Sequence, residues 1–200
     1  INLANNNSLA NITALPSSIS GGAMTLLATQ TASGSANLSF TSGIDDTYDS
    51  YVFKFYNIHP ATDNVQFLFN MSSDSGSNYN VTKTTTYFLA EHNATGGSAN
   101  LSYQSAKDLA QSTDFQKLMT DLGNAADENL SGYLTIYNPS STTFAKHFMS
   151  RTNAQAYSAT NISFDNYIAG YGNTTSAVDA IQFKMSSGNF DGVIKLYGVS

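Results

Sequence analysis

Carboxylates are the residues of this chain whose type and spacing could carry out catalysis. Asp45, Asp46 and Asp49 lie close together in GIDDTYDSY, and Asp127 is followed directly by Glu128. Two carboxyl groups at a suitable separation can cleave a glycosidic bond. Each of these groups falls between segments that we expect to be strands, where acidic side chains ordinarily solvate loops. The chain also contains no tryptophan, so the strongest aromatic platform for a sugar is missing, and we predict that these carboxylates are not catalytic.

Histidines are the second set of residues that could take part in catalysis or bind a metal. His59, His92 and His147 are the three in the chain, and there is no cysteine. Their spacing matches no zinc motif, and no strained strand-to-helix turn presents a serine nucleophile. We therefore expect no metal site and no cofactor, and we predict that the protein is not an enzyme.

The segment SSDSGSNY, residues 72 to 79, has the composition of a tight turn. The spacing of Asp74, Gly76 and Tyr79 resembles the Asp-box of sialidase-like propellers, in which the acid caps a hairpin turn away from the active site. Asp side chains bond backbone amides within turns, and Gly accepts a positive φ. A calcium loop would need further carboxylates at alternate positions, and this segment has none. We predict a structural turn motif formed by these three residues.

Tyrosine is abundant, with 12 copies. Five tyrosines in the second half of the chain could line a face that contacts a carbohydrate: Tyr133, Tyr137, Tyr157, Tyr167 and Tyr171. Tyrosine is also favoured in strands that have no binding role. The sequence leaves both interpretations open.

Composition narrows the class of protein. Charged residues make up 11% of the chain, against about a quarter in an average protein, while the formal net charge is -6. The few Lys and Arg residues are scattered, which argues against nucleic-acid binding through phosphate contacts. Apolar runs are far shorter than the ~20 residues that a membrane-spanning helix needs, so we expect no membrane insertion. A neutral surface rich in hydroxyls and amides suits exposure outside the cell or on a virus particle.

Alternation of apolar and polar side chains dominates the chain after residue 23. Val65, Phe67 and Phe69 alternate with polar or outward positions in NVQFLFNM, and AIQFKMSS repeats the pattern. Period-two alternation over short segments separated by turn residues is typical of half-buried strands. We predict an all-β fold, an antiparallel β-sandwich of jelly-roll type, over residues 23–200.

Two segments depart from this pattern. In TDFQKLMTDLG the residues Phe115, Leu118, Met119 and Leu122 have helical spacing, which predicts one short helix. Residues 1–22 lack aromatic and charged side chains and end in a Gly-Gly pair. We expect these residues to form an extended N-terminal arm or connector.

Three stretches resemble structural proteins encoded by tailed bacteriophages of marine bacteria: residues 47–80, residues 137–152 (YNPSSTTFAKHFMSRT) and residues 169–200, which end in IKLYGVS. The resemblance implies a virion-surface protein, namely a tail-fibre or other appendage domain for attachment to the host. Its implied partners are copies of itself in a homotrimer, other virion proteins and a host surface glycan or protein. A capsid decoration protein anchored by the arm is the close alternative, and a surface-polysaccharide depolymerase is the enzymatic one.

Overall fold

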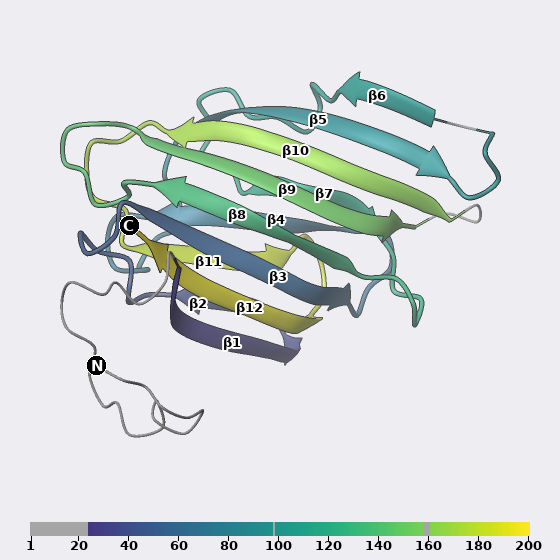
Figure 1. The fold of residues 1–200 in the computed structure, drawn as a ribbon, viewed down its shortest axis with the longest axis horizontal. Coiled ribbons are helices and arrows are strands. Elements are labelled where there is room, and N and C mark those ends of the chain that lie inside the picture. The colour runs from purple at the N-terminus through teal and green to yellow at the C-terminus, as the bar shows by residue number, and fades with distance from the viewer. Residues whose placement is uncertain (1–23, 98, 158–160) are drawn as a thin grey trace, which may run out of the picture.

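The computed structural model describes residues 24–97, 99–157 and 161–200, so the expected arm at residues 1–22 lies outside the described residues. Twelve strands are the regular elements of the described part (Figure 1). The first six are β1 (Thr25–Ser35), β2 (Asn37–Phe40), β3 (Ser50–Pro60), β4 (Val65–Ser72), β5 (Lys83–Asn93) and β6 (Ala99–Tyr103). The others are β7 (Gln116–Leu122), β8 (Leu130–Tyr137), β9 (Lys146–Ala156), β10 (Ile162–Gly172), β11 (Ala180–Met185) and β12 (Phe190–Val199).

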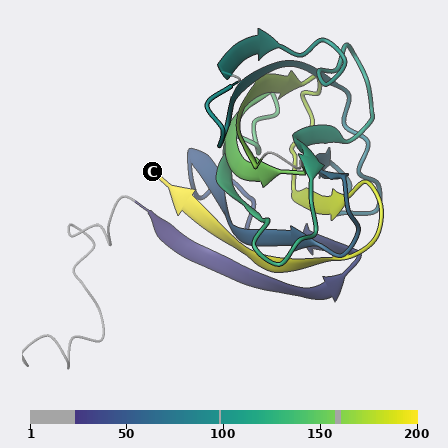
Figure 2. The same cartoon turned by 90° about the vertical axis from the view of Figure 1, so that its right-hand side faces the viewer.

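All strand pairs are antiparallel, and they form two runs. The long run has the order β1-β12-β3-β8-β9-β10-β5-β6, and the short run has the order β7-β4-β11-β2. Among the described residues, strand pairing joins the runs at Leu122 and Ala156, beside a backbone hydrogen bond from the Tyr157 amide to the Asp121 carbonyl. The long run lies in front of the short run in Figure 1, and Figure 2 shows how the strands curve until they nearly close on themselves. The expected all-β antiparallel fold is confirmed.

The helix expected over residues 113–123 is wrong, because this segment contains strand β7. Its pairing with β4 shifts register twice, so the strand is irregular. As a result, the consecutive residues Leu118 and Met119 are both fully buried, and together with Leu122 they imitate a helical spacing of apolar residues. Asp121 also has a φ of 57°, which a helix does not accept.

Aromatic side chains fill the space between the two runs. Phe183 of β11 is fully buried at the centre of this core. Its ring centroid lies 5.2 to 6.4 Å from five other phenylalanine rings: Phe40, Phe53, Phe55, Phe67 and Phe69. These rings come from β2, β3 and β4, so they bind the long run to the short run.

Polar side chains also link the runs inside the protein. The fully buried Lys83 of β5 donates through Nζ to Asn70 Oδ1 of β4 at 2.5 Å and to the Val81 carbonyl at 2.7 Å. Burial lowers the pKa of Lys83 from 10.5 to about 7. Within the long run, the Tyr87 hydroxyl of β5 donates to Asn166 Oδ1 of β10 at 2.6 Å, and burial raises the pKa of Tyr87. These interior polar groups have partners, which satisfies the main requirement for burying them.

A candidate ligand-binding face

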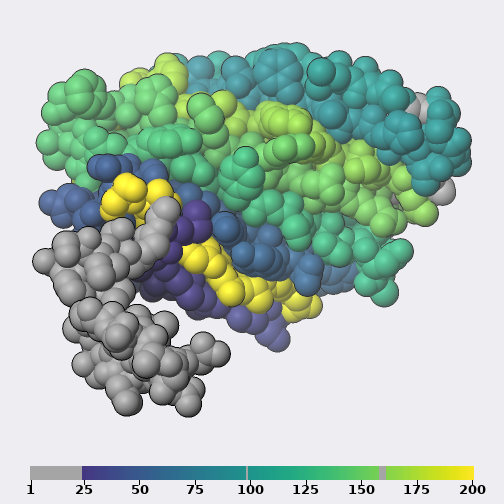
Figure 3. All heavy atoms as spheres, in the orientation of Figure 1, coloured from purple at the N-terminus to yellow at the C-terminus, as the bar shows by residue number. Residues whose placement is uncertain are grey.

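The long run has one face that points away from the short run, and we call it the outer face. Strand β9 illustrates the alternation that creates it: Phe148 and Ser150 are buried, whereas His147, Met149 and Arg151 are exposed. The outer face is turned toward the reader in Figure 3, where atoms of β8, β9 and β10 in green to yellow-green cover its centre.

Aromatic and cationic side chains cross this face in register. Direct pairing of neighbouring strands aligns seven of them, which we call the cross-strand row: Tyr103, Phe88, Tyr167, Arg151, Tyr133, Lys54 and Lys195. The exposed fractions of its aromatic members range from 39% for Tyr167 to 47% for Tyr103. Side chains directly opposite each other on one face of a sheet are in contact distance, so the row forms one continuous surface.

The centre of the row is held in place by ionic and aromatic contacts. Arg151 donates to both carboxylate oxygens of Asp165, through Nε at 3.0 Å and through Nη2 at 2.6 Å. The Tyr167 hydroxyl donates to Asp165 Oδ2 at 3.0 Å, and the Arg151 guanidinium lies 4.8 Å from the centre of the Tyr167 ring. Hydrogen bonds from Arg151 lower the pKa of Asp165. The three side chains therefore present a fixed arrangement to a ligand, which reduces the entropy lost on binding.

Two lysines occupy the end of the row on β3 and β12. Lys54 and Lys195 lie directly opposite each other in the pairing of these strands. Each ammonium group lies over a tyrosine ring, Lys54 at 5.3 Å from the ring centre of Tyr197 and Lys195 at 5.6 Å from that of Tyr56. Neither lysine belongs to an ion pair among the described residues.

Shallow depressions follow β9 and β10 along the outer face. One, of about 310 Å³, is lined by Phe88, Tyr133, Arg151 and Tyr167 from the cross-strand row, together with the exposed Met149. A second, also of about 310 Å³, shares Tyr133 and Arg151 and continues toward Asp165. The row therefore borders two adjoining hollows, one largely apolar and one of mixed character.

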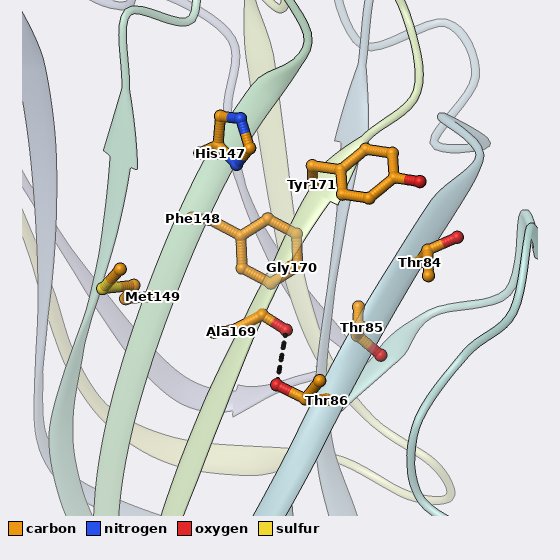
Figure 4. A pocket seen from close by; sticks show the side chains of 9 residues that line it. All are labelled: Thr84, Thr85, Thr86, His147, Phe148, Met149, Ala169, Gly170 and Tyr171. Atoms are coloured by element: carbon orange, nitrogen blue, oxygen red, sulfur yellow. Dashed lines mark hydrogen bonds between the residues drawn. The ribbon is translucent and has the colours of Figure 1, made fainter.

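A third depression of about 310 Å³ continues in the other direction along the same strands. Figure 4 shows His147 and Tyr171 near each other at one end, and Thr86 beside Ala169 further along. The two rings have centroids 6.0 Å apart, and the Thr86 hydroxyl donates to the Ala169 carbonyl at 3.4 Å. The side chains of Thr86 and Ala169 are small, so a hollow remains beside the rings of Phe148 and Tyr171.

The five tyrosines named from the sequence do not all lie together. Tyr133 and Tyr167 belong to the cross-strand row, and Tyr171 lines the third depression. Tyr137, the last residue of β8, and Tyr157, just after β9, are exposed but line none of these depressions.

Sequence reasoning missed several members of the face, above all Phe88, Arg151 and the lysine pair. The alternation in HFMSRTN marks Arg151 as an outward residue of its strand. Its position between Tyr133 and Tyr167 depends on strand pairing, which that alternation does not reveal.

Two of the acidic residues named from the sequence, Asp45 and Glu128, cap their own loops. Asp45 Oδ1 accepts hydrogen bonds from the Thr47 amide at 2.9 Å and the Tyr51 hydroxyl at 3.0 Å, and the bonds from Thr47 contribute most to lowering its pKa. Glu128 is buried, and its Oε2 accepts from the Ala125 amide at 2.9 Å. Both carboxylates are therefore engaged in loop structure.

The histidines are dispersed over the fold. His59 Nδ1 lies 2.6 Å from the Glu128 carbonyl, His147 borders the third depression, and His92 is exposed near the end of β5. Within the described ranges, no cluster of three or more His, Asp or Glu side chains has an arrangement that could hold a metal ion.

The segment at residues 72–79 forms a hydrogen-bonded turn. Asp74 Oδ1 accepts from the Asn78 amide at 2.8 Å, and Asp74 Oδ2 accepts from the Asn78 side chain at 2.7 Å. Gly76 has a φ of +82°, and a Cβ there would come within 2.8 Å of the Tyr79 hydroxyl. The Ser75 amide donates to Asp179 Oδ1 at 2.9 Å. These contacts hold the turn against the segment before β11, away from the cross-strand row.

The chain matches no protein-family model, no curated protein and no solved structure. A search of the described part of the chain found no helix with the length and apolar character needed to cross a membrane.

Proposed function

We propose that this chain is an attachment domain that binds a host surface glycan through its outer face. The observation that carries this proposal is the cross-strand row, in which four exposed aromatic rings, the exposed Arg151 and two half-buried lysines lie side by side on one sheet. Exposed aromatic surface of this extent marks interaction sites on soluble proteins.

The chemistry of the row suits a sugar chain. The apolar face of a sugar ring can stack on Tyr133 or Phe88. Arg151 and Asp165 lie beside Tyr133 and can form hydrogen bonds with the hydroxyl groups of the sugar. The hollows beside the row are shallow, so a ligand would lie across the surface. An extended polysaccharide fits this geometry better than an enclosed small molecule does.

The resemblance of residues 47–80, 137–152 and 169–200 to phage structural proteins supports a location on the virion surface. In this proposal the domain belongs to a tail fibre or similar appendage, with copies of itself in a homotrimer and other virion proteins as partners. The two strand runs would be the layers of a jelly-roll β-sandwich. Counting copies per purified particle tests the location: a few copies support an appendage, whereas near-equality with the major shell protein would indicate a capsid decoration protein.

Binding is tested with Tyr133→Ala on polysaccharide extracted from the host surface. Loss of one stacking ring is expected to weaken binding roughly tenfold, as for aromatic stacking on other ring systems. Tyr157→Ala is the matched control, because Tyr157 is similarly exposed, at 50% against 44% for Tyr133, and lies outside the row. Equal binding by the two variants would contradict the proposal. Release of new reducing ends by the unmodified protein would instead indicate a depolymerase.

A further inference from the structure

The charged members of the cross-strand row are all basic, whereas the chain as a whole has a net negative charge. The protein has 14 acidic and 8 basic residues, yet the cross-strand row contains Lys54, Arg151 and Lys195. Two carboxylates contact the row: Asp165 is paired with Arg151 through two hydrogen bonds, and Asp108 accepts from the Tyr103 hydroxyl at the far end. Lys54 and Lys195 belong to no ion pair among the described residues, and they lie together at the other end of the row.

The two lysines pair directly, but their side chains diverge. Lys54 and Lys195 are opposite each other in the β3–β12 pairing. Lys54 lies over the ring of Tyr197 and Lys195 over the ring of Tyr56, and these rings are on opposite sides of the lysine pair along the strands. The rings attract each cation weakly but add no negative charge. An anionic group bound beside either ammonium group would therefore gain a charge-assisted hydrogen bond.

The aromatic part of the row begins beside this lysine pair. Tyr133 pairs directly with Lys54, and Arg151 and Tyr167 follow on the next two strands. With adjacent strands roughly 4.8 Å apart, the distance from Lys195 to Tyr167 is about 19 Å. A chain molecule lying across the strands can therefore place an anionic group at the lysines and stack a neighbouring ring on Tyr133.

We infer that the outer face binds an acidic polysaccharide, whose carboxylates are bound by Lys54 and Lys195 and whose adjoining sugar stacks on Tyr133. This inference rests on the proposed glycan-binding function and specifies its ligand class. A single-stranded nucleic acid also combines rings and negative charge, but it carries a phosphate at every unit. Such a strand would meet Asp165 in the middle of the row and Asp108, which accepts from the Tyr103 hydroxyl, at its far end.

The test uses the full chain and a panel of acidic polysaccharides with a carboxylate on alternate sugars, namely hyaluronate, unsulfated chondroitin and heparosan. Each is offered beside its carboxyl-reduced form, which keeps the sugar backbone and removes the charge. We expect at least one acidic polymer to bind, and its reduced form to bind about tenfold more weakly or less.

Substitution links this difference to the lysine pair. The double variant Lys54→Gln/Lys195→Gln should bind the acidic polymer about tenfold more weakly and lose its preference over the reduced form. Lys117→Gln, which removes a half-buried lysine of β7 in the short run, should behave as the unmodified protein does. Circular dichroism checks that each variant is folded.

The remaining outcomes distinguish the acidic ligand class from the more general claim that the outer face binds a glycan. Equal binding of acidic and reduced polymers would overturn the acidic ligand class and leave glycan binding in place. Binding of a thymidine oligonucleotide as tightly as the acidic polymer would also overturn the ligand class. No binding to any carbohydrate of the panel or to host polysaccharide would overturn both.

Discussion

Replacing Lys83 with methionine should remove a specific pH dependence from the stability of the protein. Lys83 is fully buried between β5 and β4, and its ammonium group has two oxygen acceptors, Asn70 Oδ1 and the Val81 carbonyl. Removal from water disfavours the charged amine and lowers its pKa to about 7, although the charge of Asp114 acts in the opposite direction. Methionine has a similar shape and no charge to bury.

The sign of the effect follows from proton linkage. In the unfolded chain the lysine keeps a pKa near 10.5, so between pH 7 and pH 10.5 the unfolded state binds more protons than the folded state. The contribution of Lys83 to stability is therefore largest above pH 10.5 and is lost as the pH falls through 7. At ~1.4 kcal/mol per pH unit, raising the pH from about 6 to about 9 should stabilise the unmodified protein by roughly 3 kcal/mol relative to Lys83→Met.

Urea unfolding at several pH values measures this difference. Because the chain has no tryptophan, circular dichroism or tyrosine fluorescence supplies the signal. The histidines are present in both proteins, so their contribution to the pH dependence cancels when the variant is compared with the unmodified protein. Measurements at or below about pH 9 avoid tyrosine ionisation. Lys117→Met is the control, and its difference from the unmodified protein should not change with pH. A difference for Lys83→Met that also stays constant, within about 0.5 kcal/mol over this range, would refute the buried-amine argument.

Two further predictions concern the core and the turn. Phe183→Ala should lower the free energy of unfolding by about 3 to 5 kcal/mol, measured by urea unfolding, since it leaves a cavity where five phenylalanine rings meet; a loss below about 1 kcal/mol would contradict this position in the core. Asp74→Ala should lower the melting temperature and leave glycan binding unchanged, because its carboxylate caps the turn at Asn78 and lies away from the outer face. Hydrogen bonds from Asn78 lower the pKa of Asp74. The difference in melting temperature between the variant and the unmodified protein should therefore shrink as the pH falls through that lowered pKa. An unchanged melting temperature together with lost glycan binding would disprove the turn role.

Alternation predicted the fold class because most strands bury one side chain in two. Strand β9 alternates buried and exposed side chains along nearly its whole length. In NVQFLFNM the side chains of Val65, Phe67 and Phe69 are buried as the pattern indicates, but β4 also buries Leu68 and Asn70. The helix prediction for residues 113–123 was wrong because register shifts against β4 bring two consecutive residues into the core. An irregular strand then has the apolar spacing of a helix, and the partner that causes the irregularity is distant in sequence.

The candidate site could be predicted only in part for a related reason. Tyr133, Tyr167 and Tyr171 were named from residue type alone, and all three line the depressions of the outer face. Tyr137 and Tyr157 share the residue type but not the position. What brings Lys54 and Arg151 beside Tyr133 is the pairing of β3, β8 and β9, and strand order is set by contacts across the whole core.

Mapping the bound ligand tests the central claim most directly. Nuclear magnetic resonance of isotope-labelled protein, titrated with the polysaccharide that binds best, reports which backbone amides sense the ligand. We expect the largest shifts across the middle of β3, β8, β9 and β10, around Lys54, Tyr133, Arg151 and Tyr167, with the turn at residues 72–79 unchanged. Shifts confined to that turn or to the strands of the short run would contradict glycan binding by the outer face.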